Sequence, residues 1–134
     1  MIFVDTSALY ALLDRDDLAH ERARIAWIDW LSGRRPPRLV TGNYILMESC
    51  ALVQARLGME ALRVLIDDLL PVIVLEWVTP ADHQAAMQAL LTAERRRLSL
   101  VDCVSFQLMR RIGINRAFTF DAHFAEMGFE ALPG

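Results

Sequence analysis

Short apolar runs alternate along the chain with longer segments in which apolar residues recur every three or four positions. The short runs are bounded by polar or turn-forming residues, as buried strands are. They lie at 2–4, 39–41, 72–75 and 117–120, with 129–132 as a candidate edge strand. Because they show little polar alternation, these runs are typical of parallel strands covered on both faces.

The longer segments predict helices between these strands, with glycine, proline and capping residues at their limits. The predicted helices cover 7–13, 18–31, 43–57 (beginning within Thr41-Gly42-Asn43), 59–70, 79–92, 99–113 and 121–127. Strands that alternate with helices indicate an α/β fold. We therefore expect a three-layer α/β/α domain, with a mostly parallel central sheet of four or five strands, and a single domain over residues 1–134.

Two of the predicted strands are followed at once by an aspartate. Asp5 follows Ile2-Phe3-Val4, and Asp121 follows the run 117–120. Each could simply cap the helix that comes next. However, the carboxyl ends of parallel strands are where open α/β sheets bind ligands. If the two strands are neighbours, the two acids form one acidic site.

Two further acids lie within predicted helices. Asp102 closes Ser99-Leu100-Val101-Asp102, which has the pattern of a capping box with Asp in place of the usual Glu or Gln. Glu48 lies mid-helix, and we expect it to point toward the core. A glutamate in such a place needs an arginine, a metal ion or a proton. The residues that share its helical face are Tyr44, Ile45, Ala51, Leu52 and Ala55.

Four carboxylates gathered at one sheet edge would repel one another and oppose folding. A divalent cation removes this conflict, and oxygen ligands without His or Cys select Mg²⁺ or Mn²⁺ over Zn²⁺. The chemistry that such a cluster serves best is phosphodiester hydrolysis, in which one or two ions activate a water and stabilise the leaving oxygen. The sequence thus predicts a metal-dependent nuclease.

The order and spacing of four stretches resemble the PIN-domain ribonucleases, and most closely the VapC-type toxins of bacterial toxin–antitoxin pairs. The resemblance covers essentially all 134 residues. It implies that Asp5, Glu48, Asp102 and Asp121 form the catalytic, metal-binding quartet. It also assigns Thr6, Ser7 and Thr119 to hydroxyl positions that line the pocket. The stretches are Phe3-Val4-Asp5-Thr6-Ser7-Ala8-Leu9, Thr41 through Glu48, Ser99-Leu100-Val101-Asp102 and Thr119-Phe120-Asp121-Ala122-His123-Phe124.

The resemblance also implies Mg²⁺- or Mn²⁺-dependent RNA cleavage that leaves a 5′-phosphate, a homodimer, and a cognate VapB-like antitoxin that blocks the site. Some members carry a further aspartate two residues after the last quartet acid, where this chain has His123. This departure argues against a second tightly held ion. For His123 itself, a helix-surface position is the favoured interpretation over one at the edge of the site, and His20 and His83 are expected on polar helix faces without a role.

Net charge is −3, from 14 basic and 17 acidic residues, and every basic residue is arginine. Arginine suits phosphate recognition because its planar fork binds two oxygens. Arg95, Arg96 and Arg97 precede the Ser99–Asp102 motif and are candidate RNA contacts, although a run of charge is more often a solvated face. A second candidate group is Arg110, Arg111 and Arg116. Trp27 and Trp30 have the spacing of core residues, and only exposure would make them partner contacts.

Other features of the sequence exclude some alternative functions and indicate where the protein works. Receiver domains and haloacid-dehalogenase-type phosphatases need a lysine that this chain lacks, whereas a non-catalytic PIN module that binds RNA or protein stays open. Cys50 and Cys103 are expected to be buried free thiols. No apolar run approaches the roughly 18 residues that span a bilayer. A cytoplasmic protein with no membrane partner is therefore the default expectation.

Overall fold

The computed structural model describes all 134 residues, and its centre is one sheet of five parallel strands in the order β3-β2-β1-β4-β5. The predicted α/β fold and its parallel sheet are confirmed, and the candidate edge strand is present. The strands are β1 (Ile2–Val4), β2 (Leu39–Gly42), β3 (Val74–Glu76), β4 (Arg116–Phe118) and β5 (Glu130–Leu132).

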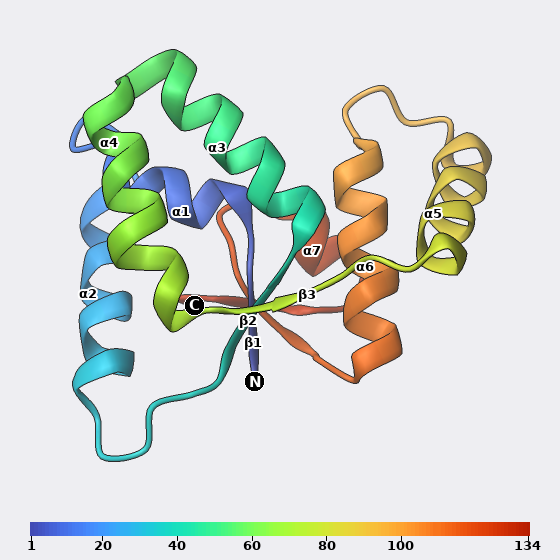
Figure 1. Cartoon of the computed structure of the whole chain (residues 1–134). Coiled ribbons are helices and arrows are strands. Elements are labelled where there is room, and N and C mark those ends of the chain that lie inside the picture. The colour runs from blue at the N-terminus through green and yellow to red at the C-terminus, as the bar shows by residue number, and fades with distance from the viewer.

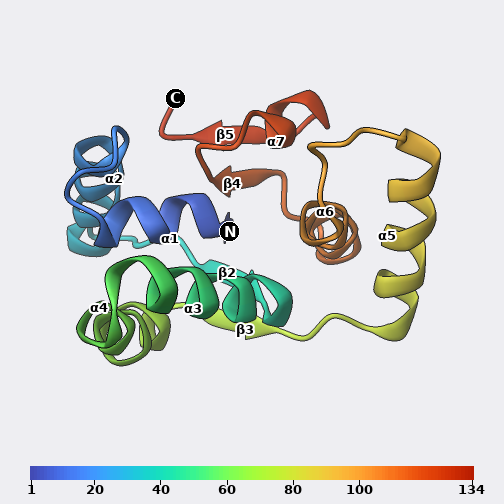
Figure 2. The ribbon, with the colours of Figure 1, turned by 90° about the horizontal axis from the view of Figure 1, so that it is seen from above.

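Helices cover both faces of this sheet (Figures 1 and 2). In both views α2 and α4 lie on one side, α6 lies on the other, and α5 packs on the outer side of α6, away from the strands. The helices α1 and α3 sit at the carboxyl edge of the sheet in Figure 1. The helices are α1 (Thr6–Leu13), α2 (His20–Ser32), α3 (Asn43–Leu57), α4 (Met59–Val64), α5 (Pro80–Ala93), α6 (Leu100–Ile112) and α7 (Ala122–Glu126).

The predicted helix 59–70 and strand 72–75 differ from the structure in detail. After α4 the chain widens into a π-helical turn, η1 (Leu65–Leu69), in which the Leu70 amide donates to the carbonyl of Leu65. A 3₁₀ turn, η2 (Leu70–Val72), follows, and β3 begins only at Val74. Pro71 has no N–H to continue a helix, so the chain tightens there before it can extend.

The core is built from the strands and the aromatic side chains that pack on them. Trp27 is buried and stacks on Phe118, with ring centroids 6.4 Å apart, while the partly buried Trp30 meets Phe118 edge-on at 4.9 Å. The core interpretation of both tryptophans is therefore confirmed. On the other side of the sheet Phe106 meets Phe124 edge-on at 5.0 Å.

The strand order places the two aspartate-delivering strands side by side. β1 pairs directly with β4, with Val4 opposite Phe118. On the other flank of β1, the buried Thr41 hydroxyl donates to the carbonyl of Val4 at 2.7 Å. The segments that follow β1 and β4 therefore leave the sheet next to each other. None of the helices is both long and apolar enough to cross a bilayer.

Candidate active site

Asp5 lies at the carboxyl end of the central strand and is only 4% exposed. It does cap α1, because the Ser7 amide donates to its Oδ2 at 3.3 Å. The same oxygen accepts the hydroxyls of Ser7 at 2.6 Å and Thr119 at 2.9 Å. Burial raises the pKa of Asp5 to about 6, repulsion from Asp102 and Asp121 adds to the rise, and the two hydroxyl hydrogen bonds oppose it. Asp5 thus both caps α1 and belongs to the acidic site.

The hydroxyls of Ser7 and Thr119 connect Asp5 to the chain that leaves β4. Ser7 Oγ accepts the amide of Phe120 at 2.9 Å, and Thr119 Oγ1 accepts the amide of Asp121 at 3.0 Å. Each hydroxyl therefore donates to the carboxylate and accepts from backbone. This pattern fixes Oδ2 of Asp5, whereas its Oδ1 accepts no hydrogen bond from the protein.

Thr6, the third predicted hydroxyl, faces a different neighbour. It is buried, and its Oγ1 accepts the hydroxyl of Ser49 on α3 at 3.0 Å. This bond joins α1 to α3 directly behind Asp5.

Asp102 and Asp121 lie close to each other on two different helices. Asp102 is the third residue of α6, and its carboxylate and the Ser99 hydroxyl form the predicted capping box. Asp121 caps α7 by accepting the amide of His123 at 2.9 Å. Burial raises the pKa of Asp102 and repulsion from Asp121 adds to the rise, against hydrogen bonds from Ser99 and the nearby charge of His123.

His123 belongs to this cluster, so the favoured interpretation of it as a helix-surface histidine was wrong. Its side chain is 16% exposed, and Nδ1 lies 2.8 Å from Oδ1 of Asp121 and 3.8 Å from Oδ2 of Asp102. The physical reason is the short helix. Because Asp121 caps α7 through the His123 amide, the backbone of His123 lies beside the capping carboxylate, and the ring contacts this carboxylate instead of solvent.

The residues at this edge fit a divalent cation. Asp102, Asp121 and His123 each offer one ligand atom, and these atoms all lie within 4.8 Å of one another. The Nδ1 atom of His123 is buried and has no hydrogen-bond partner. Three mutually repelling carboxylates beside an unpartnered nitrogen form a donor set that a cation would satisfy.

Glu48 is half-buried on α3 and makes no hydrogen bond or ion pair with any side chain. The buried face of α3 consists of Ile45, Ser49 and Val53, so Glu48 lies at the margin of this face. Its predicted companions Ala51 and Ala55 are exposed. Glu48 thus points less toward the core than the apolar pattern indicated. Its place in the quartet stays a prediction.

Comparisons with known proteins identify the family of this chain. The model of the family described as "PIN domain" matches residues 2–130. The chain belongs to the PIN domain family. The resemblance to VapC-type toxins is confirmed as well, because the 23S rRNA-specific endonuclease VapC20 of Mycobacterium tuberculosis (strain ATCC 25618 / H37Rv) is 35% identical over 130 residues, covering 96% of this chain and 95% of that protein.

Solved structures extend the comparison. The crystal structure of M. tuberculosis VapC20, described as a sarcin-ricin loop cleaving toxin, matches with a TM-score of 0.85 at 34% identity, over 96% of each chain. The structure of FitAcB from Neisseria gonorrhoeae matches with a TM-score of 0.66 at 17% identity, over 98% of this chain and 96% of that one. At that identity FitAcB supports the fold alone.

In this PIN domain the predicted arginine contacts differ in what they already bind. Arg95 forms an ion pair with Glu126 at 2.8 Å, with both side chains 47% exposed. Arg96 and Arg97 are exposed and pair with no acid. Of the second group, Arg110 lies over the ring of Phe129, 5.4 Å from its centroid, and Arg116 is exposed without an acidic partner.

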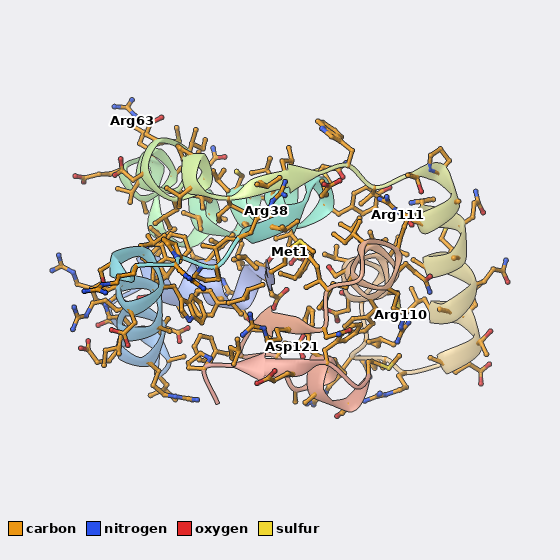
Figure 3. The ribbon with its side chains drawn as sticks, turned by 90° about the horizontal axis from the view of Figure 1, so that it is seen from below. Met1, Arg38, Arg63, Arg110, Arg111 and Asp121 are labelled. Carbon is orange, nitrogen blue, oxygen red and sulfur yellow. The ribbon has the colours of Figure 1, made fainter.

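Arg111 has a structural partner that the sequence did not reveal. Its Nε donates to Asp82 at 3.0 and 3.1 Å, and its terminal nitrogen donates to the carbonyl of Trp77. Figure 3 shows Arg110 and Arg111 on the side of α6 that faces α5, whereas Asp121 lies on the other side of α6. Arg111 therefore holds α5 against α6, and both arginines point away from the acidic cluster.

The structure also shows the surroundings of the two cysteines and of His20 and His83. Both cysteines are free, with Cys103 buried and Cys50 half-buried, and burial raises the pKa of each thiol. The rings of His20 and His83 are engaged within the fold: His20 Nδ1 lies 2.7 Å from the carbonyl of Ala11, and His83 Nδ1 lies 2.7 Å from the hydroxyl of Tyr44.

Proposed function

We propose that this protein is a metal-dependent endoribonuclease, built as a single PIN domain over residues 1–134, that acts as the toxin of a type II toxin–antitoxin pair. The observation that supports the proposal best is the gathering of Asp5, Asp102 and Asp121 at the carboxyl edge of the sheet, where each carboxylate is held by its own cap. A relative that covers nearly the whole chain is an endonuclease.

Asp5, Glu48, Asp102 and Asp121 would hold Mg²⁺ or Mn²⁺, directly or through water. An ion held there would supply positive charge to activate a water and to stabilise the leaving oxygen of a phosphodiester. Asp5 is oriented for this task, since the hydroxyls of Ser7 and Thr119 hold its Oδ2 and leave Oδ1 free. Without metal, burial and the two neighbouring acids raise the pKa of Asp5 to about 6, and a cation beside this carboxyl would offset the repulsion and favour its charged form.

The substrate we propose is ribosomal RNA. VapC20 is specific for 23S rRNA and is described as cleaving the sarcin-ricin loop, and we infer the same target class for this chain. Arg96 and Arg97 are the proposed phosphate contacts, because they are exposed, pair with no acid, and precede the helix that carries Asp102. Arg95 would first have to leave Glu126, so we expect it to contribute less.

The proposed partners follow from the VapC-type relationship. They are a VapB-like antitoxin that silences the site and a second copy of the chain in a homodimer. We expect the protein to work in the cytoplasm, where its RNA substrate is, and to have no membrane partner.

The test is cleavage of a ribosomal RNA fragment containing the sarcin–ricin loop, with Mg²⁺, with Mn²⁺ and with EDTA. We expect metal-dependent cleavage by the wild type that Asp5→Asn abolishes. A matched control is Asp67→Asn, which removes an exposed acid from η1 and should cleave normally. A folded wild type that binds the RNA but leaves it intact in both metals would favour the non-catalytic module. Cleavage that persists in EDTA would contradict the metal dependence.

A further inference from the structure

His123 Nδ1 is the one buried side-chain nitrogen or oxygen in this protein that has no hydrogen-bond partner. Burying a polar atom without a partner is unfavourable, so such an atom requires an explanation. Its surroundings are acidic, because carboxylate oxygens of Asp121 and Asp102 lie 2.8 and 3.8 Å away.

The short distance to Asp121 does not satisfy this nitrogen. Oδ1 of Asp121 already accepts the backbone amide of His123 at 2.9 Å, and the ring meets the same oxygen without the alignment of a hydrogen bond. The amide that binds Asp121 belongs to the same residue, so the backbone from which the ring extends lies beside this carboxylate. Nδ1 thus lies close to both carboxylates without a hydrogen bond to either.

We propose that His123 Nδ1 is a direct ligand of the divalent ion that Asp102 and Asp121 hold, and that this nitrogen makes the centre prefer Mn²⁺ to Mg²⁺. The inference rests on the metal centre of the proposed function, and it adds which ion this centre prefers. Neighbouring ligand atoms around one octahedral ion at about 2.1 Å lie about 3 Å apart, and opposite ones about 4.2 Å apart. The separation of 2.8 Å from Asp121 is close to that of neighbouring ligands, and the separation of 3.8 Å from Asp102 lies between the two values, so a small movement of either side chain would complete the geometry.

The chemistry of the donor set decides which ion is favoured. Mg²⁺ is a hard ion that binds oxygen ligands and keeps much of its water, whereas imidazole nitrogen is a ligand of first-row transition metals. A neutral His123 ring would carry its proton on Nε2 and present the Nδ1 lone pair to the ion. A carboxylate in the same place would remove this preference.

The test uses Mn²⁺ as the probe and pulsed electron paramagnetic resonance as the readout. We expect the Mn²⁺-loaded wild type to show the coupling of a directly bound ¹⁴N, and selective ¹⁵N-histidine labelling to replace it with a ¹⁵N coupling. His123→Asp and His123→Ala should bind Mn²⁺ without the nitrogen coupling. His83→Gln is the control, because His83 faces the Tyr44 hydroxyl, and it should keep the coupling.

Calorimetric titration gives an independent measure. The ratio of the dissociation constants for Mg²⁺ and Mn²⁺ should fall at least about tenfold in His123→Asp relative to the wild type. Mn²⁺ that binds the wild type without a histidine coupling would overturn the inference and leave the proposed function standing. A folded wild type that binds no Mn²⁺ at all would refute the metal centre, and with it both proposals.

Discussion

Without metal, the stability of this protein should fall as the pH rises from 4 to 7, because of Asp5. Its carboxyl is buried and is repelled by Asp102 and Asp121, and its pKa is raised from the usual 3.8 to about 6. In the unfolded chain Asp5 loses its proton near pH 4, whereas in the folded protein it keeps the proton until about pH 6. Between these values the folded state binds more protons, so the free energy of unfolding decreases with rising pH.

The magnitude follows from the two pKa values. One pKa unit corresponds to about 1.4 kcal/mol, so the difference between 3.8 and about 6 corresponds to about 3 kcal/mol. This stability is fully present below pH 4 and is lost by about pH 7. Asp102 adds a loss of the same sign, because its pKa is raised as well. For a domain of ordinary stability, about 3 kcal/mol is a large fraction of the total.

The assay is urea unfolding in EDTA at half-unit steps between pH 4 and pH 7.5, for the wild type and Asp5→Asn. Asparagine does not titrate, so the wild type should lose about 2.5 kcal/mol more than the variant over this range, because part of the effect is already lost at pH 4. Asp67→Asn serves as the control for removing a charge and should follow the wild type. Parallel curves for the wild type and Asp5→Asn would refute the idea that burial holds a proton on Asp5.

Three other predictions concern the metal, the position of α5 and the start of α6. At pH 7.5, Mg²⁺ or Mn²⁺ at a hundred times its dissociation constant should stabilise the protein by about 2.7 kcal/mol. The same ion concentration should stabilise it less below pH 6, where Asp5 is protonated, and melting curves measure both effects. Arg111→Met should destabilise the protein by about 2 kcal/mol in urea, because it leaves the buried Asp82 unpaired, whereas Arg110→Met should cost clearly less. Ser99→Ala should cost about 1 kcal/mol and reduce RNA cleavage through the loosened Asp102; loss of stability without loss of cleavage would mean that the cap does not position this acid.

The sequence was informative wherever the local pattern and the tertiary structure agree. The capping boxes at Thr79 and Ser99 mark helix starts that the structure reproduces, and the aspartates after β1 and β4 mark the edge where the site lies. The strand order itself could not be read from any pattern. From the sequence alone, one site for the acids after β1 and β4 is expected only on the condition that these strands are neighbours, and the Val4–Phe118 register meets this condition.

What the sequence could not predict depends on orientation in space. His123 occupies a helical turn too short to have a polar and an apolar face, so periodicity carried no information about its ring. The apolar neighbours of Glu48 suggested that it is buried. In the structure Glu48 lies at the margin of the buried face of α3, beside exposed alanines, and is therefore partly exposed. The ion pair between Asp82 and Arg111 joins residues 29 positions apart, and only the packing of α5 on α6 brings them together.

The hydrogen bond between Thr119 and Asp5 has a consequence for how the protein is made, since it joins residues 114 positions apart. Synthesis runs from the N-terminus, so β1 and β2 can pair early, while β4 and the hydroxyl that anchors Asp5 emerge from the ribosome much later. Until β4 is inserted beside β1, Asp5 and Asp121 are carried on separate parts of the chain. A nascent copy, tethered to the very particle that contains its proposed target, therefore has no assembled site with which to cut it.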